Sequence, residues 1–202
     1  MASKSPPGLP PSATTSHGTR GRPAVPGADL TQVSIAPLPR ENFALAASWL
    51  ADPATNRLLT AEWRDRAVDA SLLAIAARNR KNLFYGVAGD GTLCGLVAFS
   101  ELEPRDRSGM IWYVLGNRAF AGRGVTTSAV AQMCGVGFRE LHLESIWAMV
   151  LTPNAASVRV LEKVGFRASG RLRRVERIGD EQIDRLYFDL LPAELSEMAK
   201  GS

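Results

Sequence analysis

The stretch "NRAFAGRGVTTSAV", residues 117–130, decides how the rest of the chain is interpreted. It lies between a segment typical of a strand (108–116) and a helix predicted over 125–140, with Gly122 and Gly124 at the junction. The first amides of a helix have no intrahelical acceptor, and the helix dipole adds partial positive charge there. An anion satisfies both, so the stretch predicts a phosphate-binding site, with a plain glycine turn as the alternative.

The side chains around the turn narrow the kind of phosphate site. The hydroxyls of Thr126 and Thr127 can supplement the amides, and Arg123 is long enough to reach a second phosphate. No Gly-Lys-Ser/Thr follows at the spacing of a P-loop, and the third glycine of the dinucleotide fingerprint is absent. The turn therefore predicts an anion site that belongs to neither of these two classes.

The rest of the sequence predicts a single α+β (mixed α/β) domain with a mixed sheet, because strands in a row precede an alternation of strands and helices. Asp90-Gly91 marks a hairpin turn, and Val68, Leu72, Ile75 and Ala76 are expected to face inward from the second helix. The predicted strands cover 32–38, 83–89, 92–102, 108–116, 144–151, 167–177 and 182–190; the helices cover 41–52, 64–80, 125–140 and 154–166, with a short one from Pro192.

Composition excludes several classes of protein. The net charge of +4 comes from basic residues that are scattered along the chain apart from one arginine cluster, and this mild excess favours small anions about as well as nucleic acid. Cys94 and Cys134 lie in apolar stretches without a partner pattern, so buried thiols are expected, with neither a disulfide nor a metal site. No apolar run reaches the length of a membrane span.

The first 29 residues differ from the remainder. Residues 1–29 are rich in Pro, Gly and Ser and lack apolar periodicity, so they predict a disordered tail ahead of a domain over 30–202. We expect a cytoplasmic protein. The serines and arginines of the tail leave an organelle transit peptide as the alternative.

Two motifs at a fixed separation resemble the GCN5-related N-acetyltransferase (GNAT) family, in particular its RimJ- and RimL-like branch. The family segment Gln/Arg-x-x-Gly-x-Gly/Ala is matched here by residues 121–126, and its Asn-x-x-Ser…Leu…Gly-Phe pattern is matched within "NAASVRVLEKVGF" (154–166). The resemblance covers 32–191, strand order included. Ala121 departs from the usual Gln or Arg, and Met110 occupies the place where the branch often has a glutamate.

The resemblance implies a GNAT-like fold, with a twisted mixed sheet of about seven strands and helices on both faces. It implies acetyl-CoA as co-substrate, no metal, and direct acetyl transfer to a primary amine in a ternary complex. The acceptor would be a small amine, such as an amino sugar or nucleotide sugar, or a protein N-terminus. A non-catalytic acyl-CoA-binding module and a ribosome- or RNA-associated protein are the alternatives. The resemblance leaves open a monomer or a homodimer.

The resemblance also implies roles for individual residues. The coenzyme pyrophosphate would lie at the turn, the pantetheine arm would pair with the strand before it, and Asn154 and Ser157 would contact the arm and the leaving thiolate. For Asn154 a simple helix cap is the alternative, and for Ser157 an ordinary first-turn position. The cofactor-binding candidates are Tyr113, Val114, Leu115, Gly122, Arg123, Gly124, Val125, Thr126, Thr127, Asn154 and Ser157.

The general base and the acceptor pocket are the least defined parts of this interpretation. Besides Ser157, the catalytic candidates are Glu101 and Glu103, which end the neighbouring strand, and Tyr113; solvated loop carboxylates and core packing are the alternatives. The acceptor pocket is expected to involve Trp49, Trp63, Trp112 and the arginines of the penultimate strand, Arg171, Arg173, Arg174 and Arg177. That arginine cluster suggests an acidic acceptor, with a solvated strand face as the alternative.

Overall fold

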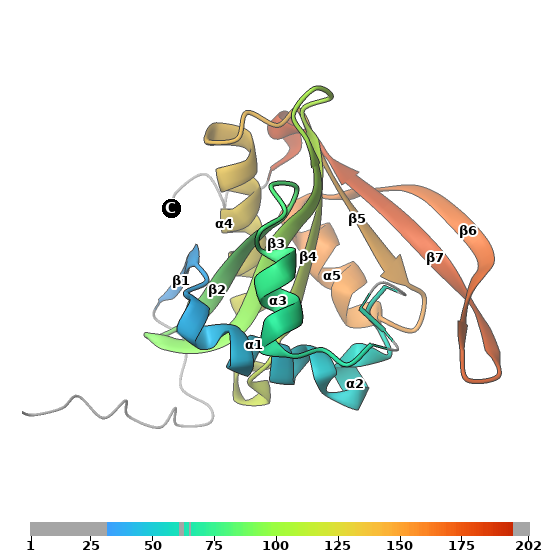
Figure 1. The fold of residues 1–202 in the computed structure, drawn as a ribbon. Helices are drawn as coiled ribbons and strands as arrows, with labels where there is room; N and C mark the ends of the chain where they lie inside the picture. The colour runs from blue at the N-terminus through green and yellow to red at the C-terminus, as the bar shows by residue number, and fades with distance from the viewer. Residues whose placement is uncertain (1–31, 61–62, 65, 196–202) are drawn as a thin grey trace, which may run out of the picture.

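The computed structural model describes residues 32–60, 63–64 and 66–195. Its centre is a seven-stranded mixed sheet in the order β1-β2-β3-β4-β5-β7-β6 (Figure 1). The tail predicted over 1–29 and its boundary with a domain from residue 30 lie outside the described residues. The strands are β1 (Val33–Pro37), β2 (Leu83–Gly89), β3 (Thr92–Glu103), β4 (Ser108–Leu115), β5 (Ser145–Leu151), β6 (Arg167–Ile178) and β7 (Glu181–Leu190).

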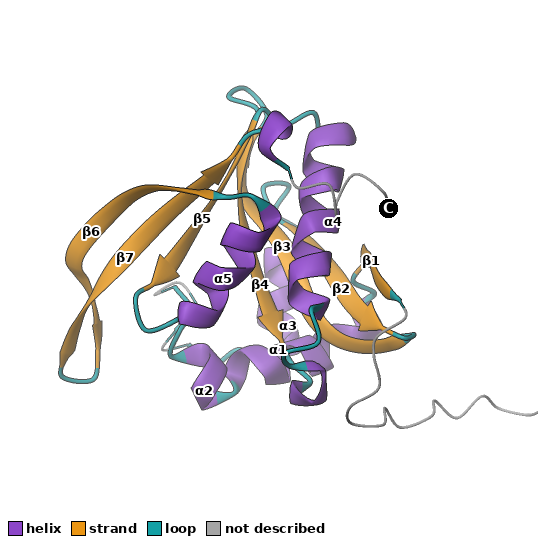
Figure 2. Cartoon of the chain, turned by 180° about the vertical axis from the view of Figure 1, so that it is seen from behind, coloured by secondary structure: helices purple, strands orange, loops and turns teal. Residues whose placement is uncertain are grey.

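Helices cover both faces of this sheet. Figure 1 shows the helices of the first half on one face, and Figure 2 shows α4 and α5 side by side on the other. The helical segments are η1 (Arg40–Asn42), α1 (Phe43–Ala51), α2 (Pro53–Asn56), α3 (Ala70–Ala76), η2 (Arg118–Phe120), α4 (Val125–Arg139), α5 (Ala155–Val164) and η3 (Pro192–Glu194). The predicted fold class, a mixed sheet of about seven strands with helices on both faces, is confirmed.

The alternation of side chains along β3 gives the molecule two hydrophobic cores. Leu96 and Ala98 pack with α1 and α3, whereas Val97 and Phe99 pack with α4 and α5. Successive residues of a strand point to opposite faces, and all four of these are at most 1% exposed. An uninterrupted apolar run is therefore required at this position of the sheet.

The first half of the chain differs from the sequence prediction in its helices. The helix predicted over 64–80 begins only at Ala70, because the Asp69 carboxylate accepts a hydrogen bond from the Leu72 amide at 2.8 Å and caps it. The helix phase follows this cap, so Leu73 is buried and Ile75, predicted to face inward, is 64% exposed. That assignment was wrong for Ile75.

A short helix, α2, was not predicted. Asp52 and Pro53 end α1, as expected, but they also begin the next helix. The Asp52 carboxylate accepts from the amides of Ala54 and Thr55, and Pro53 occupies the first helical position, where its missing N–H costs nothing. This pair of residues turns the chain and brings α2 close to the end of β4.

The parallel pair at the middle of the sheet stops early. β4 and β5 pair only at Ser108–Ser145, Gly109–Ile146 and Met110–Trp147. Beyond that point β4 continues along β3 as far as Leu115, and β5 continues along β7 as far as Leu151. The two strands therefore diverge, and the gap between them widens toward the N-terminus of α4 (Figure 1).

Candidate active site

A cavity of about 540 Å³ occupies the gap between β4 and β5. Its walls come from these two strands, the first turn of α4, one side of α5 over most of its length, η2, and residues in and after α2. The sheet itself thus creates the site, because it stops pairing where the two strands separate. The cavity joins the two sequence motifs, since both the glycine turn and the start of α5 line it.

The glycine turn presents open backbone at one end of this cavity. Gly122 and Gly124 have φ angles of 75° and 77°, a conformation that glycine adopts without the cost other residues incur. A Cβ built at either position has no atom within 4 Å, so the space beside the turn is open. Gly124 is the N-cap of α4, and no described side chain caps that helix. The arrangement has the features of an anion site.

Most of the predicted turn residues face the cavity, but the Arg123 side chain does not. Gly122, Gly124, Val125, Thr126 and Thr127 all line it. The Arg123 guanidinium instead lies over the Phe120 ring, 5.3 Å from its centre, and 3.9 Å from the Asp90 carboxylate. The prediction that this side chain reaches a second phosphate has no support in this geometry, and only its amide remains a candidate.

Three cations at the cavity were missed by the sequence reasoning. Arg118 lies on η2, while Arg159 and Lys163 are one turn apart on α5, and all three line the cavity with exposed side chains. The Arg118 guanidinium is 3.6 Å from the Asp52 carboxylate. The signal available in the sequence was the spacing of four between Arg159 and Lys163, which places both on one helix face.

The predicted pantetheine strand also lines the cavity. Tyr113, Val114 and Leu115 contribute to its wall, and their Cα partners lie only on β3. No β5 residue pairs with this part of β4 in the described structure. The backbone N–H and C=O groups on the side of β4 that faces β5 are therefore free to pair with an extended ligand, just as those of an edge strand can pair with an added strand.

Tyr113, Asn154 and Ser157 are brought together at the start of α5. The Asn154 side-chain oxygen accepts from the Ser157 amide at 3.2 Å, so the alternative role of Asn154 as a helix cap is present, and both residues line the cavity.

The Tyr113 hydroxyl donates to the Ser157 carbonyl at 3.1 Å. Burial raises the pKa of Tyr113 far above its usual value near 10, so its phenol remains protonated at neutral pH. Tyr113 is suited to donate hydrogen bonds and is unsuited to act as a base.

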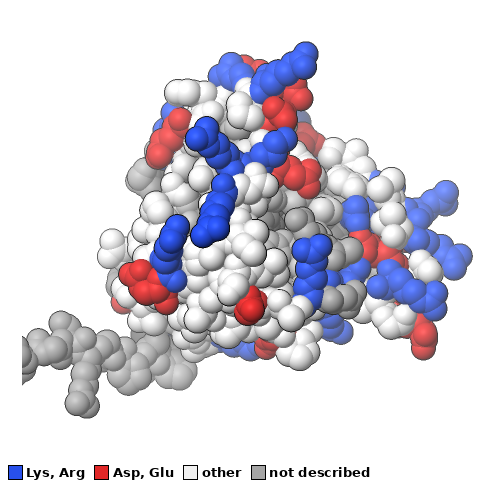
Figure 3. Space-filling view, in the orientation of Figure 1, with Lys and Arg blue, Asp and Glu red and all other residues white. Residues whose placement is uncertain are grey.

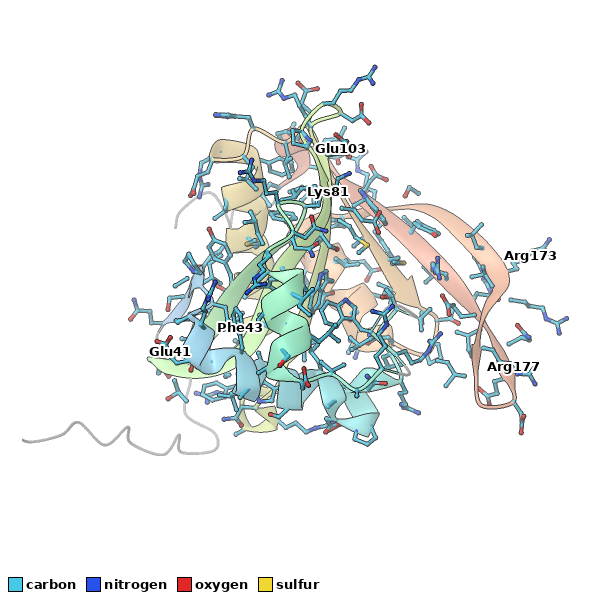
Figure 4. All side chains as sticks on the ribbon, viewed as in Figure 1. Glu41, Phe43, Lys81, Glu103, Arg173 and Arg177 are labelled. Carbon is cyan, nitrogen blue, oxygen red and sulfur yellow. The ribbon has the colours of Figure 1, made fainter. Side chains whose placement is uncertain are left out.

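The two glutamates proposed as bases do not line the cavity. Glu101 is exposed, with a φ of 52° at an irregularity between β3 and β4. The Glu103 carboxylate is 3.1 Å from Lys81, whose hydrogen bond lowers the pKa of Glu103. Figure 4 shows Glu103 and Lys81 together at one end of the sheet. Their position and the lowered pKa of Glu103 make both carboxylates poor candidates for the general base.

Met110 occupies the point where β4 and β5 diverge. It is 5% exposed, lines the cavity, and is the last β4 residue paired with β5. Among the described residues that line the cavity, the ionisable ones are Tyr113 and the three cations. The position at which the family branch often carries a glutamate is therefore apolar in this chain.

Two of the three predicted tryptophans form the wall on the α2 side. Trp63 and Trp112 both line the cavity, with ring centroids 5.5 Å apart, and Phe84 packs 5.9 Å from Trp112. Trp49 packs instead on Gly116, where a Cβ would lie 2.0 Å from its ring. Only a glycine permits this contact, so Trp49 fixes α1 to the end of β4 and does not line the cavity.

The predicted arginine cluster lies elsewhere. Arg171, Arg173 and Arg174 border a separate shallow hollow on the β6–β7 hairpin, together with Leu172 and Asp184. The Arg171 Nε donates to Asp184 at 2.7 Å, and Figure 3 shows acidic side chains among the basic ones on this part of the surface. Figure 4 shows Arg173 and Arg177 pointing outward from the hairpin. The argument for an acidic acceptor therefore loses its basis.

The described residues include neither a cluster of metal ligands nor a membrane-spanning helix. They contain no group of three or more His, Cys, Asp or Glu side chains that could hold a metal ion. None of their helices is long and apolar enough to cross a membrane. Cys94 and Cys134 are buried free thiols, and burial raises the pKa of both.

Comparison with known proteins identifies the same family that the two sequence motifs resemble. The sequence model of the Acetyltransferase (GNAT) domain matches residues 33–167. Probable N-acetyltransferase YjcK of Bacillus subtilis (strain 168) is 37% identical over 105 residues, covering 52% of this chain and 58% of that protein. The chain spans 56–59% of the length of three curated relatives that it matches.

Two solved structures share the fold. Mycobacterium smegmatis RimJ, in complex with CoA-disulfide, is 26% identical with a TM-score of 0.68, covering 83% of this chain and 86% of that one. The spermidine N-acetyltransferase from Vibrio cholerae, in complex with CoA and spermine, is 18% identical with a TM-score of 0.72, covering 81% and 97%. These matches confirm the predicted family: the chain belongs to the GNAT acetyltransferases.

Proposed function

We propose that the chain transfers an acetyl group from acetyl-CoA directly to a primary amine, with both substrates bound at once. The observation that carries this proposal is the cavity between the diverging strands β4 and β5, which ends at the uncapped, glycine-opened N-terminus of α4. Such a cavity offers an extended backbone edge and an anion site in line. These match the amide-containing arm and the pyrophosphate of coenzyme A.

The charged end of the coenzyme would lie at the turn and α5. The amides of residues 123–127 would face the pyrophosphate, while Arg159 and Lys163 would supply positive charge at the rim. The arm would then run along the free edge of Tyr113, Val114 and Leu115. A β4 amide directed at the thioester carbonyl would stabilise the developing oxyanion by about 3 kcal/mol.

The reaction in this arrangement is a direct displacement. The neutral amine attacks the thioester carbon and forms a tetrahedral intermediate. The intermediate collapses as the C–S bond breaks, and the proton lost from the amine nitrogen passes, directly or through water, to the departing thiolate, so that the products are the amide and the thiol of CoA. The Ser157 hydroxyl is the group that we assign to hydrogen-bond this thiolate, since it lines the cavity beside Asn154. Tyr113 orients the start of α5 through its hydrogen bond to the Ser157 carbonyl.

The acceptor would approach from the wall that contains Trp63 and Trp112. We propose a small amine or a protein N-terminal amine as its class; the spermidine N-acetyltransferase that shares the fold holds the amine spermine. An apolar wall favours an uncharged amine, because burial disfavours the ammonium form. The nucleotide-sugar hypothesis rested on the arginine cluster, which lies outside the cavity.

The coenzyme site is tested by Gly124→Glu, with Gly179→Glu as a matched control. Both glycines have positive φ angles and open space around a built Cβ, so the backbone cost of substitution is similar. Only Gly124 borders the cavity, where a carboxylate would repel phosphate. By calorimetry, Gly124→Glu should abolish acetyl-CoA binding while Gly179→Glu binds normally. Equal affinities in the two variants would refute the assignment.

The apolar Met110 gives weight to a second candidate function, an acyl-CoA-binding module without transfer activity. The two are separated by measuring CoA thiol release with a panel of amines that includes spermine and short peptides with free N-termini. Release that depends on the amine supports the enzyme. Tight acetyl-CoA binding without acetylated products in mass spectra would favour the binding module.

A further inference from the structure

A buried carboxylate, Glu176, stands out on an otherwise exposed strand. It is 7% exposed, whereas the other residues of β6 are exposed, apart from one that is half-buried. Burying a carboxylate is costly unless it is paired and hydrogen-bonded. The position therefore calls for a partner that repays this cost.

An irregularity in β6 turns Glu176 inward. The register between β6 and β7 shifts between Leu172 and Glu176, and Arg174 within this stretch has a φ of 55°. Asp184 on β7 holds the irregular stretch, since its carboxylate accepts from the Arg174 amide at 2.7 Å and from the Arg171 side chain. Bulges of this kind redirect a side chain to the other face of a strand.

Glu176 binds two arginines from different parts of the chain. Its Oε2 is 2.5 Å from the Arg64 Nη2, and its Oε1 pairs with the Arg185 guanidinium from β7. Arg64 is itself 8% exposed and precedes α3, so it belongs to the half of the molecule beyond the gap. The ion pair therefore bridges the open end of the diverging strands.

Arg64 is in turn connected to the cavity wall. Its Nη1 donates to the Leu59 carbonyl at 3.4 Å, and its amide donates to the Thr60 carbonyl at 2.8 Å. Leu59, Thr60 and the adjacent Trp63 all line the cavity. We call residues 58–60, 63 and 64 the wall segment. No regular helix or strand includes it, so side-chain contacts restrain it: those of Arg64, the hydrogen bond from the Asn56 side chain to the Trp63 carbonyl at 3.2 Å, and the packing of Trp63 on Trp112.

We propose that Glu176 is a positioning residue that holds the wall segment against the β6–β7 hairpin and so shapes the acceptor side of the cavity. The link to the acceptor rests on the proposed acetyltransferase function. The coenzyme side has separate supports, namely the glycine turn and the caps of α5. Loss of Glu176 should therefore weaken acceptor use and spare acetyl-CoA binding.

The test compares Glu176→Gln with Glu144→Gln in the full chain. Glu144 also forms an Arg–Glu pair between the two halves, with Arg107, but at the closed end of the gap, and that pair is exposed. In hydrogen exchange, peptides covering 57–69 should exchange about tenfold faster in Glu176→Gln and at the wild-type rate in Glu144→Gln. Unaltered exchange in Glu176→Gln, or equal acceleration in both, would overturn the proposal.

Kinetics supply the second readout, with spermine and a short free-N-terminus peptide as the acceptor probes. KM for the amine should rise about tenfold in Glu176→Gln, while the acetyl-CoA dissociation constant changes less than about twofold. An equal loss for both substrates would indicate a general structural role and contradict the proposal. If the wild-type protein acetylates neither probe, the proposed activity fails for these acceptors. The hydrogen-exchange experiment then still tests whether Glu176 holds the wall segment.

Arg64→Lys is a milder second variant, which keeps the proposal testable if Glu176→Gln fails to fold. It leaves Glu176 paired with Arg185 and removes the forked contact that spans Glu176 and the Leu59 carbonyl. Exchange should rise in the same peptides, by less than in Glu176→Gln. The double variant should be perturbed by less than the sum of the two single variants, because both changes weaken the same connection between Arg64 and Glu176. Wild-type exchange in Arg64→Lys would refute the route through Arg64.

Discussion

Tyr113 is kept protonated by its surroundings, and this has a consequence for stability. Burial raises the pKa of its phenol above the usual value near 10, so the folded state retains a proton that the unfolded chain loses first. The stability that it contributes is complete below pH 10 and is lost as the pH rises above that value.

Tyr113→Phe should therefore flatten the alkaline end of the stability profile. Between pH 10 and 11 the free energy of unfolding of the wild type should fall by up to about 1.4 kcal/mol per pH unit from this group, and the variant should lack that component. Urea denaturation from pH 8 to 11 measures the difference. Parallel curves for the two proteins would contradict the assignment.

Ser157→Ala tests the role that we assign to the serine hydroxyl. The backbone amide of residue 157 still donates to the Asn154 side chain in the variant, so the N-terminal cap of α5 is preserved. Turnover should fall roughly tenfold or more, the value of one hydrogen bond to a charged group, while acetyl-CoA affinity changes little. Steady-state kinetics and calorimetry give the two quantities, and unchanged turnover would remove the serine from the mechanism.

Helix α5 is the element on which the site depends most, because it carries Ser157, Arg159 and Lys163 between two defined caps. Gly165 ends it with a φ of 113°, and a Cβ there would lie 2.3 Å from the Glu194 carbonyl oxygen. The end of the helix is thereby fixed against η3. The helix cannot shift along its axis without losing either the Asn154 cap or this contact.

Gly165→Ala should consequently destabilise the protein by about 2–3 kcal/mol, from backbone strain and the clash together. Gly179→Ala is the matched comparison, since its φ of 59° imposes strain but its surroundings are open, and about 1 kcal/mol is expected. Urea unfolding of both variants provides the measurement. A Gly165→Ala cost no larger than that of Gly179→Ala would show that η3 gives way.

The distribution of charge matters at the scale of the whole molecule. The net charge is only +4, yet the ionisable groups at the rim of the cavity are cations, while the basic residues of the β6–β7 hairpin are interspersed with acids. A positive rim attracts polyanions over distances of the Debye length, about 10 Å at 0.1 M salt.

Replacing both Arg159 and Lys163 by glutamine should weaken acetyl-CoA binding several-fold at low salt and flatten its dependence on ionic strength. The pair Arg173→Gln and Arg177→Gln removes the same charge from the hairpin and should leave affinity and salt dependence unchanged. Titrations at about 20 and 300 mM salt distinguish the two. Equal effects would indicate that net charge, and not the rim, sets the affinity.

The features that could be predicted from sequence are those encoded locally. The glycine turn, the Asn154 cap and the succession of strands along the chain depend on short stretches, and each appears in the structure. The failures have tertiary causes. Only the fold brings Arg118 to the cavity that Arg159 and Lys163 also line. The antiparallel register places Glu103 opposite Ser108, at the end of β4 that still pairs with β5, so the two glutamates lie away from the cavity.

Because β4–β5 pairing ends early, the orientation and the affinity of a bound ligand depend on different parts of the cavity. In solution the unpaired peptide groups of these strands are hydrated, so an arm that pairs with them exchanges one set of hydrogen bonds for another at little net gain. Tightness must then come from the phosphate end and from apolar contacts. The gap decides where a bound molecule lies and in which orientation, and the rest of the cavity decides how long it stays.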